Sequence, residues 1–248
     1  MRVTFLGTGS AMPVSGRAQT GLLLESDSHA LLVDCGSGVL SRLAETPVGY
    51  EGISSVLLTH HHLDHVSDLM ALLKARWLAG EEYLEIVGPE GTRELVEGLL
   101  GVHSYLQNRL TVEIREIGPY PFEVAGFDVE GFEVRHSMDT LAYRFAHDDS
   151  EGEFVFSGDT EPFDGLANFA DGAAVLAHEC AFPDNLDISN HTTPSALGRV
   201  LQGHDIDQVF LTHLYPHAAR QTDELVAGVT RNFDGDVAVA EDGLTVEL

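Results

Sequence analysis

The chain has 248 residues, of which 44% are hydrophobic, enough for a globular protein with a sizeable buried core. It contains 40 acidic and only 13 basic residues, and the net charge of −27 argues against a broad basic surface that holds nucleic acid. Lys74 is the only lysine, so we favour a halophile protein, whose charges multimolar salt screens within a few ångströms, over an ordinary acidic cytosolic one.

The first half of the chain predicts strands separated by two helices. The N-terminus enters an apolar strand at once, without the features of a signal peptide, and no apolar run reaches the ~18 residues of a membrane span. We therefore expect a cytoplasmic protein. The predicted strands are Val3–Leu6, Gly21–Glu25, Ala30–Asp34, Ser55–Leu58 and Leu84–Val87. The predicted helices are Val66–Leu78 and Pro89–Leu100, the second with proline in its first turn.

The second half is rich in strands and then alternates again. The predicted strands are Thr111–Glu116, Phe127–Arg135, Leu141–Ala146, Glu153–Ser157, Ala173–Ala177, Gln208–Leu211, Val237–Ala240 and Leu244–Glu247. The predicted helices are Thr193–Gln202 and Gln221–Arg231. Two β-rich halves with interspersed helices predict an α/β protein with two sheets sandwiched between helices. We expect a single domain over residues 1–248.

A cluster of polar side chains follows the strand at Ser55–Leu58. His60, His62, Asp64 and His65 form the pattern His-x-His-x-Asp-His. Packing does not require three imidazoles and a carboxylate within six residues, whereas Zn²⁺, Mn²⁺ and related ions prefer these ligands. His61 faces away in an alternating strand and is not expected to be a ligand.

Further candidate ligands follow the ends of other predicted strands. They are Asp34, His136, Asp159, Glu179 and His213. In sheets with helical crossovers, sites form where strand ends open into loops. The number of ligands suits two metal ions. We assign His60, His62 and His136 to one, Asp64, His65 and His213 to the other, and Asp159 to a bridge between them. Such a pair can hold a hydroxide and clamp a phosphodiester for in-line attack.

These motifs resemble the metallo-β-lactamase superfamily, and within it ribonuclease Z and related short phosphodiesterases, almost from end to end. The matching segments are Phe5-Leu6-Gly7-Thr8-Gly9-Ser10, Asp34, His60 to His65, Arg135-His136-Ser137, Ser157-Gly158-Asp159-Thr160 and Leu211-Thr212-His213. The resemblance implies an αββα sandwich with two mixed sheets flanked by helices. It also implies two divalent ions, zinc with Mn²⁺ as the alternative, attack on phosphorus by a metal-held hydroxide, and a homodimer.

Two segments narrow the resemblance to ribonuclease Z. His178-Glu179-Cys180-Ala181 resembles its His-Glu-Ala-Thr motif, and Asn190-His191-Thr192-Thr193 resembles its His-Ser-Thr motif. The resemblance implies that His191 protonates the leaving oxygen and that Glu179 orients His191, with Asp64 as the third catalytic candidate. A leaving alkoxide needs such a proton, so the pair favours phosphodiester chemistry.

Three departures affect the expected substrate. Ribonuclease Z usually carries a tRNA-gripping arm between the third and fourth motifs, but only 22 residues separate His136 from Asp159. Asp68 replaces a usual glycine, and there either alters the entrance or favours a helix N-terminus. The surface is also strongly acidic. We therefore expect hydrolysis of a small nucleotide-like phosphodiester, or of an RNA end held mainly by the metals.

Other classes remain open at this point. A thioester or lactone hydrolase of the same superfamily would use the same metals without an acid at His191, and a non-catalytic scaffold would have lost them. A redox di-iron enzyme ranks last, because His62 is intact. Asp34 is expected to support the site rather than to bind metal, and Arg144 either contacts phosphate or pairs with an acid. Cys35 and Cys180 are read as small buried residues.

Overall fold

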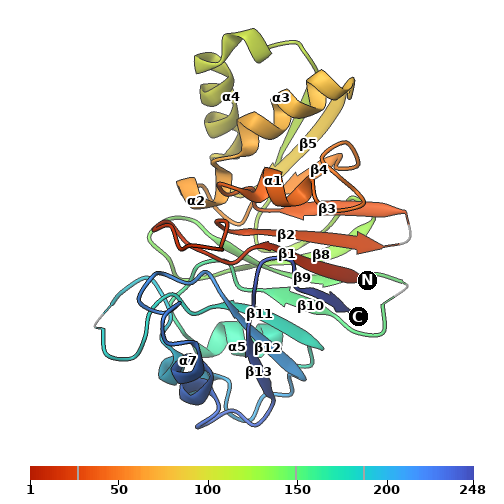
Figure 1. The fold of residues 1–248 in the computed structure, drawn as a ribbon. Coiled ribbons are helices and arrows are strands. Elements are labelled where there is room, and N and C mark those ends of the chain that lie inside the picture. Colours follow the sequence, from red (N-terminus) through yellow and green to blue (C-terminus); the bar gives the residue numbers. More distant parts are fainter. Residues whose placement is uncertain (27, 149, 187) are drawn as a thin grey trace.

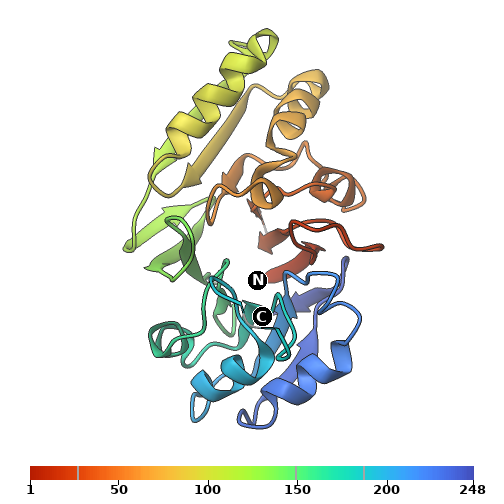
Figure 2. The same ribbon diagram turned by 90° about the vertical axis from the view of Figure 1, so that its left-hand side faces the viewer.

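The computed structural model describes residues 1–26, 28–148, 150–186 and 188–248. Two seven-stranded β-sheets stack face to face, and helices cover the outer face of each sheet (Figure 1 and Figure 2). The predicted sandwich of two mixed sheets between helices is confirmed.

The first sheet has the order β14-β1-β2-β3-β4-β5-β6. Strands β14 to β3 pair antiparallel, and β3 to β6 pair in parallel. Its strands are β1 (Arg2–Gly7), β2 (Gly21–Ser26), β3 (His29–Val33), β4 (Ser55–Leu57), β5 (Tyr83–Gly88), β6 (Thr111–Glu116) and β14 (Thr245–Glu247). The central strands are apolar on both faces because both faces are covered.

The second sheet has the order β13-β12-β11-β10-β9-β8-β7. Strands β7 to β10 pair antiparallel, and β10 to β13 pair in parallel. Its strands are β7 (Pro121–Val124), β8 (Phe127–Glu133), β9 (Leu141–Ala146), β10 (Phe154–Phe156), β11 (Val175–Glu179), β12 (Gln208–Thr212) and β13 (Asp236–Val239). In β8, buried and exposed residues alternate at its start, as one buried face requires.

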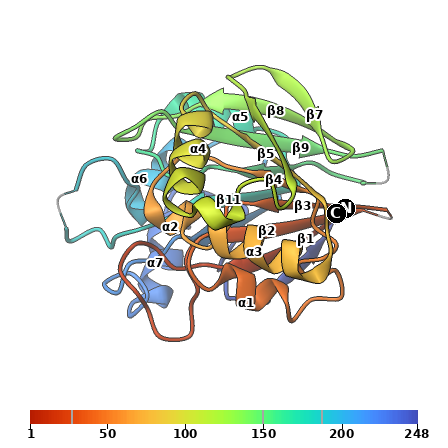
Figure 3. The ribbon, with the colours of Figure 1, turned by 90° about the horizontal axis from the view of Figure 1, so that it is seen from above.

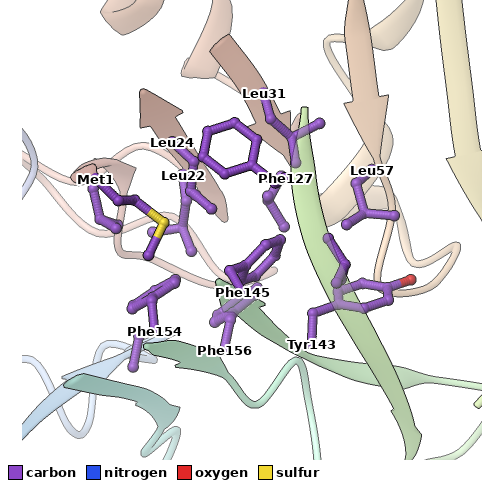
Figure 4. Packing of buried hydrophobic residues seen from close by; sticks show 14 of the residues in the cluster. Met1, Leu22, Leu24, Leu31, Leu57, Phe127, Tyr143, Phe145, Phe154 and Phe156 are labelled. Atoms are coloured by element: carbon purple, nitrogen blue, oxygen red, sulfur yellow. The ribbon is translucent and has the colours of Figure 1, made fainter. Parts of the chain in front are cut away.

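Side chains from the inner faces of the two sheets form the central core. Leu22, Leu24 and Leu31 of the first sheet meet Phe127 and Phe145 of the second (Figure 4), and each of these five is at most 1% exposed. Complete burial of such a side chain stabilises the folded state by about 1.5–3 kcal/mol. This layer therefore holds the two sheets together face to face.

Each sheet also has an apolar outer layer beneath its helices. The helices of the first half are α1 (Val39–Leu43), α2 (Leu63–Val66), α3 (Leu69–Ala79), α4 (Thr92–Val102) and the 3₁₀ turn η1 (Ser104–Leu106). Those of the second half are α5 (Asp164–Ala170), α6 (Pro194–Val200) and α7 (Thr222–Val229). From above, α1, α3 and α4 lie over the first sheet (Figure 3). None of the helices in the described ranges is long and apolar enough to cross a membrane.

One predicted helix is divided in two. The helix expected over Val66–Leu78 is interrupted between α2 and α3, where the main-chain N–H of Asp68 donates to the carbonyl of Cys35 over 2.9 Å. The carboxylate of Asp68 accepts the main-chain N–H groups of Gly38 (2.9 Å) and Leu40 (3.0 Å), at the start of α1. Asp68 thus stabilises a helix N-terminus, which is one of the two roles expected for it. The helix is α1, however, and not the helix that follows Asp68 in the chain.

Among the described residues, five short elements were not predicted, namely α1, α2, η1, β7 and α5, and α2 shares only Val66 with a predicted helix. The other predicted elements occur with small shifts at their ends. For example, Asp34 and Leu58 fall just beyond β3 and β4. The two chain ends meet by strand pairing, with the N-terminal amine of Met1 donating to the carbonyl of Leu248 over 3.0 Å.

The loop between β1 and β2 is held against the end of the second sheet. Asp242 accepts the main-chain N–H of Thr8 (3.0 Å) on one oxygen and that of Ala18 (2.6 Å) on the other. Arg17 donates to the carbonyl of Ala240 over 2.6 Å. The loop therefore lies beside the segment that follows β12, where Leu214 donates to the carbonyl of Thr8 over 3.0 Å.

Candidate metal centre

All of the predicted metal-ligand side chains lie together at one end of the sheets. They follow β4, β8, β10 and β12 or belong to α2, which in Figure 1 lies at the opposite end of the sheets from the chain termini. Their ligand atoms form two groups, within each of which all atoms lie within 4.8 Å of one another. The groups are His60, His62, His136 and Asp159, and then Asp64, His65 and His213.

The first group consists of three imidazoles and a carboxylate. Nδ1 of His62 lies 3.1 Å from Nε2 of His60 and 3.1 Å from Nε2 of His136. Oδ2 of Asp159 lies 3.7 Å from Nε2 of His60 and 3.9 Å from Nε2 of His136. Imidazole lone pairs brought this close repel one another unless a proton or a cation lies between them.

The second group shares Asp159 with the first. Nε2 of His213 lies 3.1 Å from Oδ2 of Asp64 and 3.3 Å from Oδ2 of Asp159. Nε2 of His65 lies 3.5 Å from Oδ1 of Asp159 and 3.9 Å from Oδ2 of Asp64. Oδ2 of Asp159 therefore faces both groups and Oδ1 faces the second, so the carboxylate lies where a bridge between two ions would lie.

Hydrogen bonds behind the two groups fix the orientation of several imidazoles. Nδ1–H of His65 donates to Oδ2 of Asp34 over 2.7 Å, and Nδ1–H of His136 donates to the carbonyl of Asn190 over 2.8 Å. Because a carbonyl and a carboxylate only accept, each bond leaves the Nε2 lone pair directed into the centre. Asp34 thus lies behind His65 and outside both groups, as expected from the sequence.

Thr59 connects this support to His60. Its main-chain N–H and its hydroxyl donate to the two oxygens of Asp34, each over 2.8 Å. The hydroxyl oxygen lies 3.0 Å from Nδ1 of His60 and accepts its proton. The sequence alone does not indicate these roles of Thr59 and Asn190, because a threonine at a strand end and a carbonyl in a loop form no recognisable pattern.

The electrostatic field of the centre favours neutral imidazoles in the first group and carboxylate anions. Burial lowers the pKa of His60 and of His62, and the neighbouring imidazoles lower both further. Burial would raise the pKa of Asp159, but His213 and His65 hold it well below its ordinary value. Burial would also lower the pKa of His65, yet Asp159 and Asp34 raise it well above 6.5. His60, His62 and Asp159 therefore carry the forms that divalent ions need as ligands, whereas His65 would have to release a proton to bind one.

The backbone around the centre adopts conformations that L-residues usually avoid. Asp34 and His213 have φ of 58° and 57°, in the left-handed region. Such strain costs about 1–3 kcal/mol per residue and occurs most often at functional sites. A Cβ at Gly36 would lie 2.1 Å from the carbonyl oxygen of Asp64. Glycine is therefore required there for the loop after β3 to approach α2.

His191 and Glu179 form a third part of the site. Nδ1 of His191 lies 2.9 Å from Oε1 of Glu179, which is fully buried. Glu179 also accepts the main-chain N–H groups of Thr160 (3.0 Å), Ala181 (3.0 Å) and Thr192 (3.1 Å). Burial would lower the pKa of His191, but the hydrogen bond and the charge of Glu179 raise it above its ordinary value. A ligand nitrogen of His191 also lies within 4.8 Å of ligand atoms of Asp159 and His213.

Three other residues singled out by sequence lie outside these groups. Nε2 of His61 lies 2.8 Å from Oγ1 of Thr92, so His61 is directed towards the start of α4. Asp68 holds α1, as described above. Arg144 pairs with Glu153, with Nε 2.9 Å from Oε2, and therefore takes the acid-pairing alternative rather than the phosphate contact.

The chemistry of the donor set fits divalent cations. Among the described residues, Nε2 of His65 and Nδ1 of His213 are buried without a hydrogen-bond partner. Buried polar atoms without partners are rare, because each costs about 1–3 kcal/mol. A cation next to Nε2 of His65 would remove that cost there, and would separate the crowded lone pairs of the first group.

Comparisons with known proteins agree with this geometry. Residues 1–224 match the family described as anti-Pycsar protein Apyc1. The chain is 32% identical over 275 aligned positions to a ribonuclease Z of Mycobacterium bovis, covering 100% of this chain and 98% of the relative. It is 26% identical over 303 positions to a ribonuclease Z of Haloferax volcanii, covering 100% and 95%. The metallo-β-lactamase fold protein YhfI from Bacillus subtilis superposes with a TM-score of 0.87 at 26% identity, covering 100% of this chain and 99% of that one.

Proposed function

This chain belongs to the anti-Pycsar Apyc1 family within the metallo-β-lactamase superfamily, and we propose that it hydrolyses a small nucleotide-like phosphodiester with His191 as general acid. It is a metal-dependent hydrolase of the ribonuclease Z-like type. The observation that carries the proposal is the His191–Glu179 pair, 2.9 Å apart beside Asp159 and His213. Hydrolysis of a thioester does not need that pair, because a thiolate leaves without a proton.

The two groups of side chains would hold two divalent ions, which we propose are Zn²⁺. His60, His62 and His136 would hold one ion, Asp64, His65 and His213 the other, and Asp159 would bridge them. Imidazole and carboxylate suit zinc better than magnesium or calcium, which prefer oxygen ligands alone. When bound, such ions supply a Lewis acid that lowers the pKa of water and offsets the charge of a phosphodiester.

Residues of the chain itself hold the proton that the leaving oxygen takes. Nδ1–H of His191 is used by Glu179, so Nε2 carries the proton that a leaving oxygen can take. The raised pKa of His191 keeps that proton in place near neutral pH. Because Glu179 is held by three main-chain N–H groups, the ring orientation is set before a substrate arrives.

We propose a small substrate because the segment between His136 and Asp159 is short. Within the described part of that segment, β9 and β10 form two strands of the second sheet. That leaves only short turns and no length for an arm that grips RNA. The formal charge of −27 would also repel a long polyanion at low salt.

The test is a substrate panel with the Zn²⁺-loaded and the Mn²⁺-loaded protein in molar KCl. We expect hydrolysis of thymidine 5′-p-nitrophenyl phosphate, and no faster cleavage of a tRNA precursor. S-lactoylglutathione and a simple lactone should not be hydrolysed at comparable rates. Preferential thioester or lactone hydrolysis would overturn the proposal, and preferential processing of the tRNA precursor would overturn its substrate size.

Two further expectations concern the assembly and the location of the protein. Homodimerisation stays a prediction, which light scattering coupled to size-exclusion chromatography in molar KCl would check. The cytoplasmic location also stays a prediction, which fractionation of the source cells would check.

A further inference from the structure

Two aromatic side chains stack on each other beside the candidate metal centre. Glu179 of β11 is paired with Thr212 of β12, and the parallel register places Phe182 and Tyr215 each three residues beyond this pair. Their ring centroids lie 4.4 Å apart with an interplanar angle of 23°. The main-chain N–H of Tyr215 donates to the carbonyl of Ala181 over 3.3 Å, so the two loops are tied together at this point.

The stacked pair contacts residues of the site directly. The centroid of His191 lies 5.8 Å from the centroid of Phe182 and 5.8 Å from that of Tyr215. The centroid of His213 lies 5.9 Å from that of Tyr215.

Both rings are only partly buried, although they lie next to His213, which is buried. Each ring stacks one face on the other ring and keeps part of its surface accessible to solvent. The rest of the centre offers imidazoles and carboxylates, which suit a phosphate held by metal ions and do not distinguish one ester from another. An aromatic surface at this distance from the phosphate position can recognise a ring that the substrate carries.

We propose that Phe182 and Tyr215 form a stacking platform for the nucleobase of the substrate, adjacent to the phosphate held at the metal centre. The inference rests on the proposed function and specifies its substrate as a nucleoside phosphodiester. Stacking tolerates any base, because every base has a π-face. The platform therefore selects nucleosides over other alcohols, and does not select one base strongly over another.

The test compares two ligands that differ only in the base. Binding of adenosine 5′-monophosphate and of ribose 5-phosphate to the Zn²⁺-loaded protein is measured by calorimetry in molar KCl. We expect the nucleotide to bind at least ~5-fold more tightly, since a base stacked on an aromatic side chain contributes about 5- to 150-fold in affinity. Equal affinity for the two ligands would overturn the proposal.

Substitutions then assign the preference to the rings. Tyr215→Leu and Phe182→Leu should each remove most of the preference for the nucleotide and leave ribose 5-phosphate binding within about twofold, whereas Tyr215→Phe should keep the preference. A merely structural role would weaken both ligands together and would not change their ratio. Tyr120→Leu is the matched control, because Tyr120 is 50% exposed and lies outside the site. If a leucine variant fails to fold, Tyr215→Trp retains a ring and must retain the preference.

The binding measurement does not depend on turnover. A protein that prefers the nucleotide but hydrolyses no phosphodiester would contradict the proposed function and leave the platform intact. Hydrolysis of phosphodiesters with no difference between the two ligands would contradict the platform alone.

Discussion

Nδ1 of His191 lies 2.9 Å from Oε1 of Glu179, a carboxylate that is fully buried and that also accepts three main-chain N–H groups. One carboxylate therefore joins the loop after β10 to both ends of the connection between β11 and α6, which carries His191. A carboxylate in this position can orient a general acid, and here it couples the position of that acid to the folding of two loops.

Replacing His191 by alanine tests the general acid. We expect His191→Ala to retain two equivalents of metal and to lower kcat at least ~10²-fold on a nucleotide ester with an alkoxide leaving group. Elemental analysis and steady-state kinetics provide the two measurements. The loss should be smaller with a p-nitrophenolate leaving group, which needs little protonation.

His217→Ala is the matched control, since His217 is exposed and belongs to neither ligand group. An unchanged rate in His191→Ala would remove the acid role. Loss of one metal equivalent would instead make His191 a ligand, since one of its ring nitrogens lies within 4.8 Å of ligand atoms of Asp159 and His213.

The pH dependence of the reaction should report the His191–Glu179 pair. Burial lowers the pKa of His191, but Glu179 raises it to a value above the ordinary 6.5, so kcat should fall only as pH rises through that higher value. Glu179→Gln removes the negative charge, so the alkaline limb should move to lower pH. The stability that this pair contributes is fully present below the unfolded pKa of His191 and is lost as pH rises through the folded pKa.

The measurement is the pH profile of kcat for both proteins, together with their melting temperatures. Glutamine cannot accept all of the N–H groups that Glu179 accepts, so a lower melting temperature is expected as well. An alkaline limb at the same pH in both proteins would assign that limb to another group.

Removing Asp159 should affect both ions at once. Its oxygens lie 3.3 Å from Nε2 of His213 and 3.7 Å from Nε2 of His60, one imidazole in each group. We expect Asp159→Asn to retain less than one equivalent of metal after dialysis, whereas His62→Ala should weaken mainly one ion. Calorimetric titration with Zn²⁺ checks this, and two intact sites in Asp159→Asn would contradict the bridge.

The sequence predicts which side chains gather at one edge of the sheets, because these side chains lie next to strand ends. His60, His62, Asp64 and His65 follow one strand in a dense pattern, and the other candidates occupy similar positions along the chain. Parallel strands bring such positions to a common edge, so strand ends and residue types together indicate the site. The two groups that the structure assembles match the assignment made from spacing and from resemblance.

The supporting contacts could not be predicted in the same way. Thr59 reaches Asp34 and His60 only because two adjacent strands end together, and the contribution of Asn190 is a main-chain carbonyl, which any residue has. The short helix α1 was missed because its N-terminus is held by Asp68, which lies 28 to 30 residues further along the chain. Long-range hydrogen bonds of this kind leave no local pattern.

Asp68→Gly tests the role of that carboxylate. Removing a cap of two main-chain N–H groups should cost about 1 kcal/mol and lower the melting temperature by about 2–4 °C in a chain of this size. Metal content and kcat should stay within about twofold, because Asp68 belongs to neither ligand group. Thermal denaturation and elemental analysis check both parts. A large loss of activity with unchanged stability would place Asp68 at the entrance of the site instead.

Salt should stabilise this protein up to molar concentrations. The 13 basic residues cannot neutralise 40 acidic ones, and several bases are already used in ion pairs such as Arg144–Glu153 and Arg115–Glu85. The remaining carboxylates repel one another, and the screening length falls from about 10 Å at 0.1 M to about 3 Å at 1 M salt. The melting temperature should therefore rise from low salt to about 2 M KCl. Sucrose at equal osmolality is the control, and it should raise the melting temperature less. A melting temperature that stays flat or falls over this range would mean that the acidic composition is not an adaptation to salt.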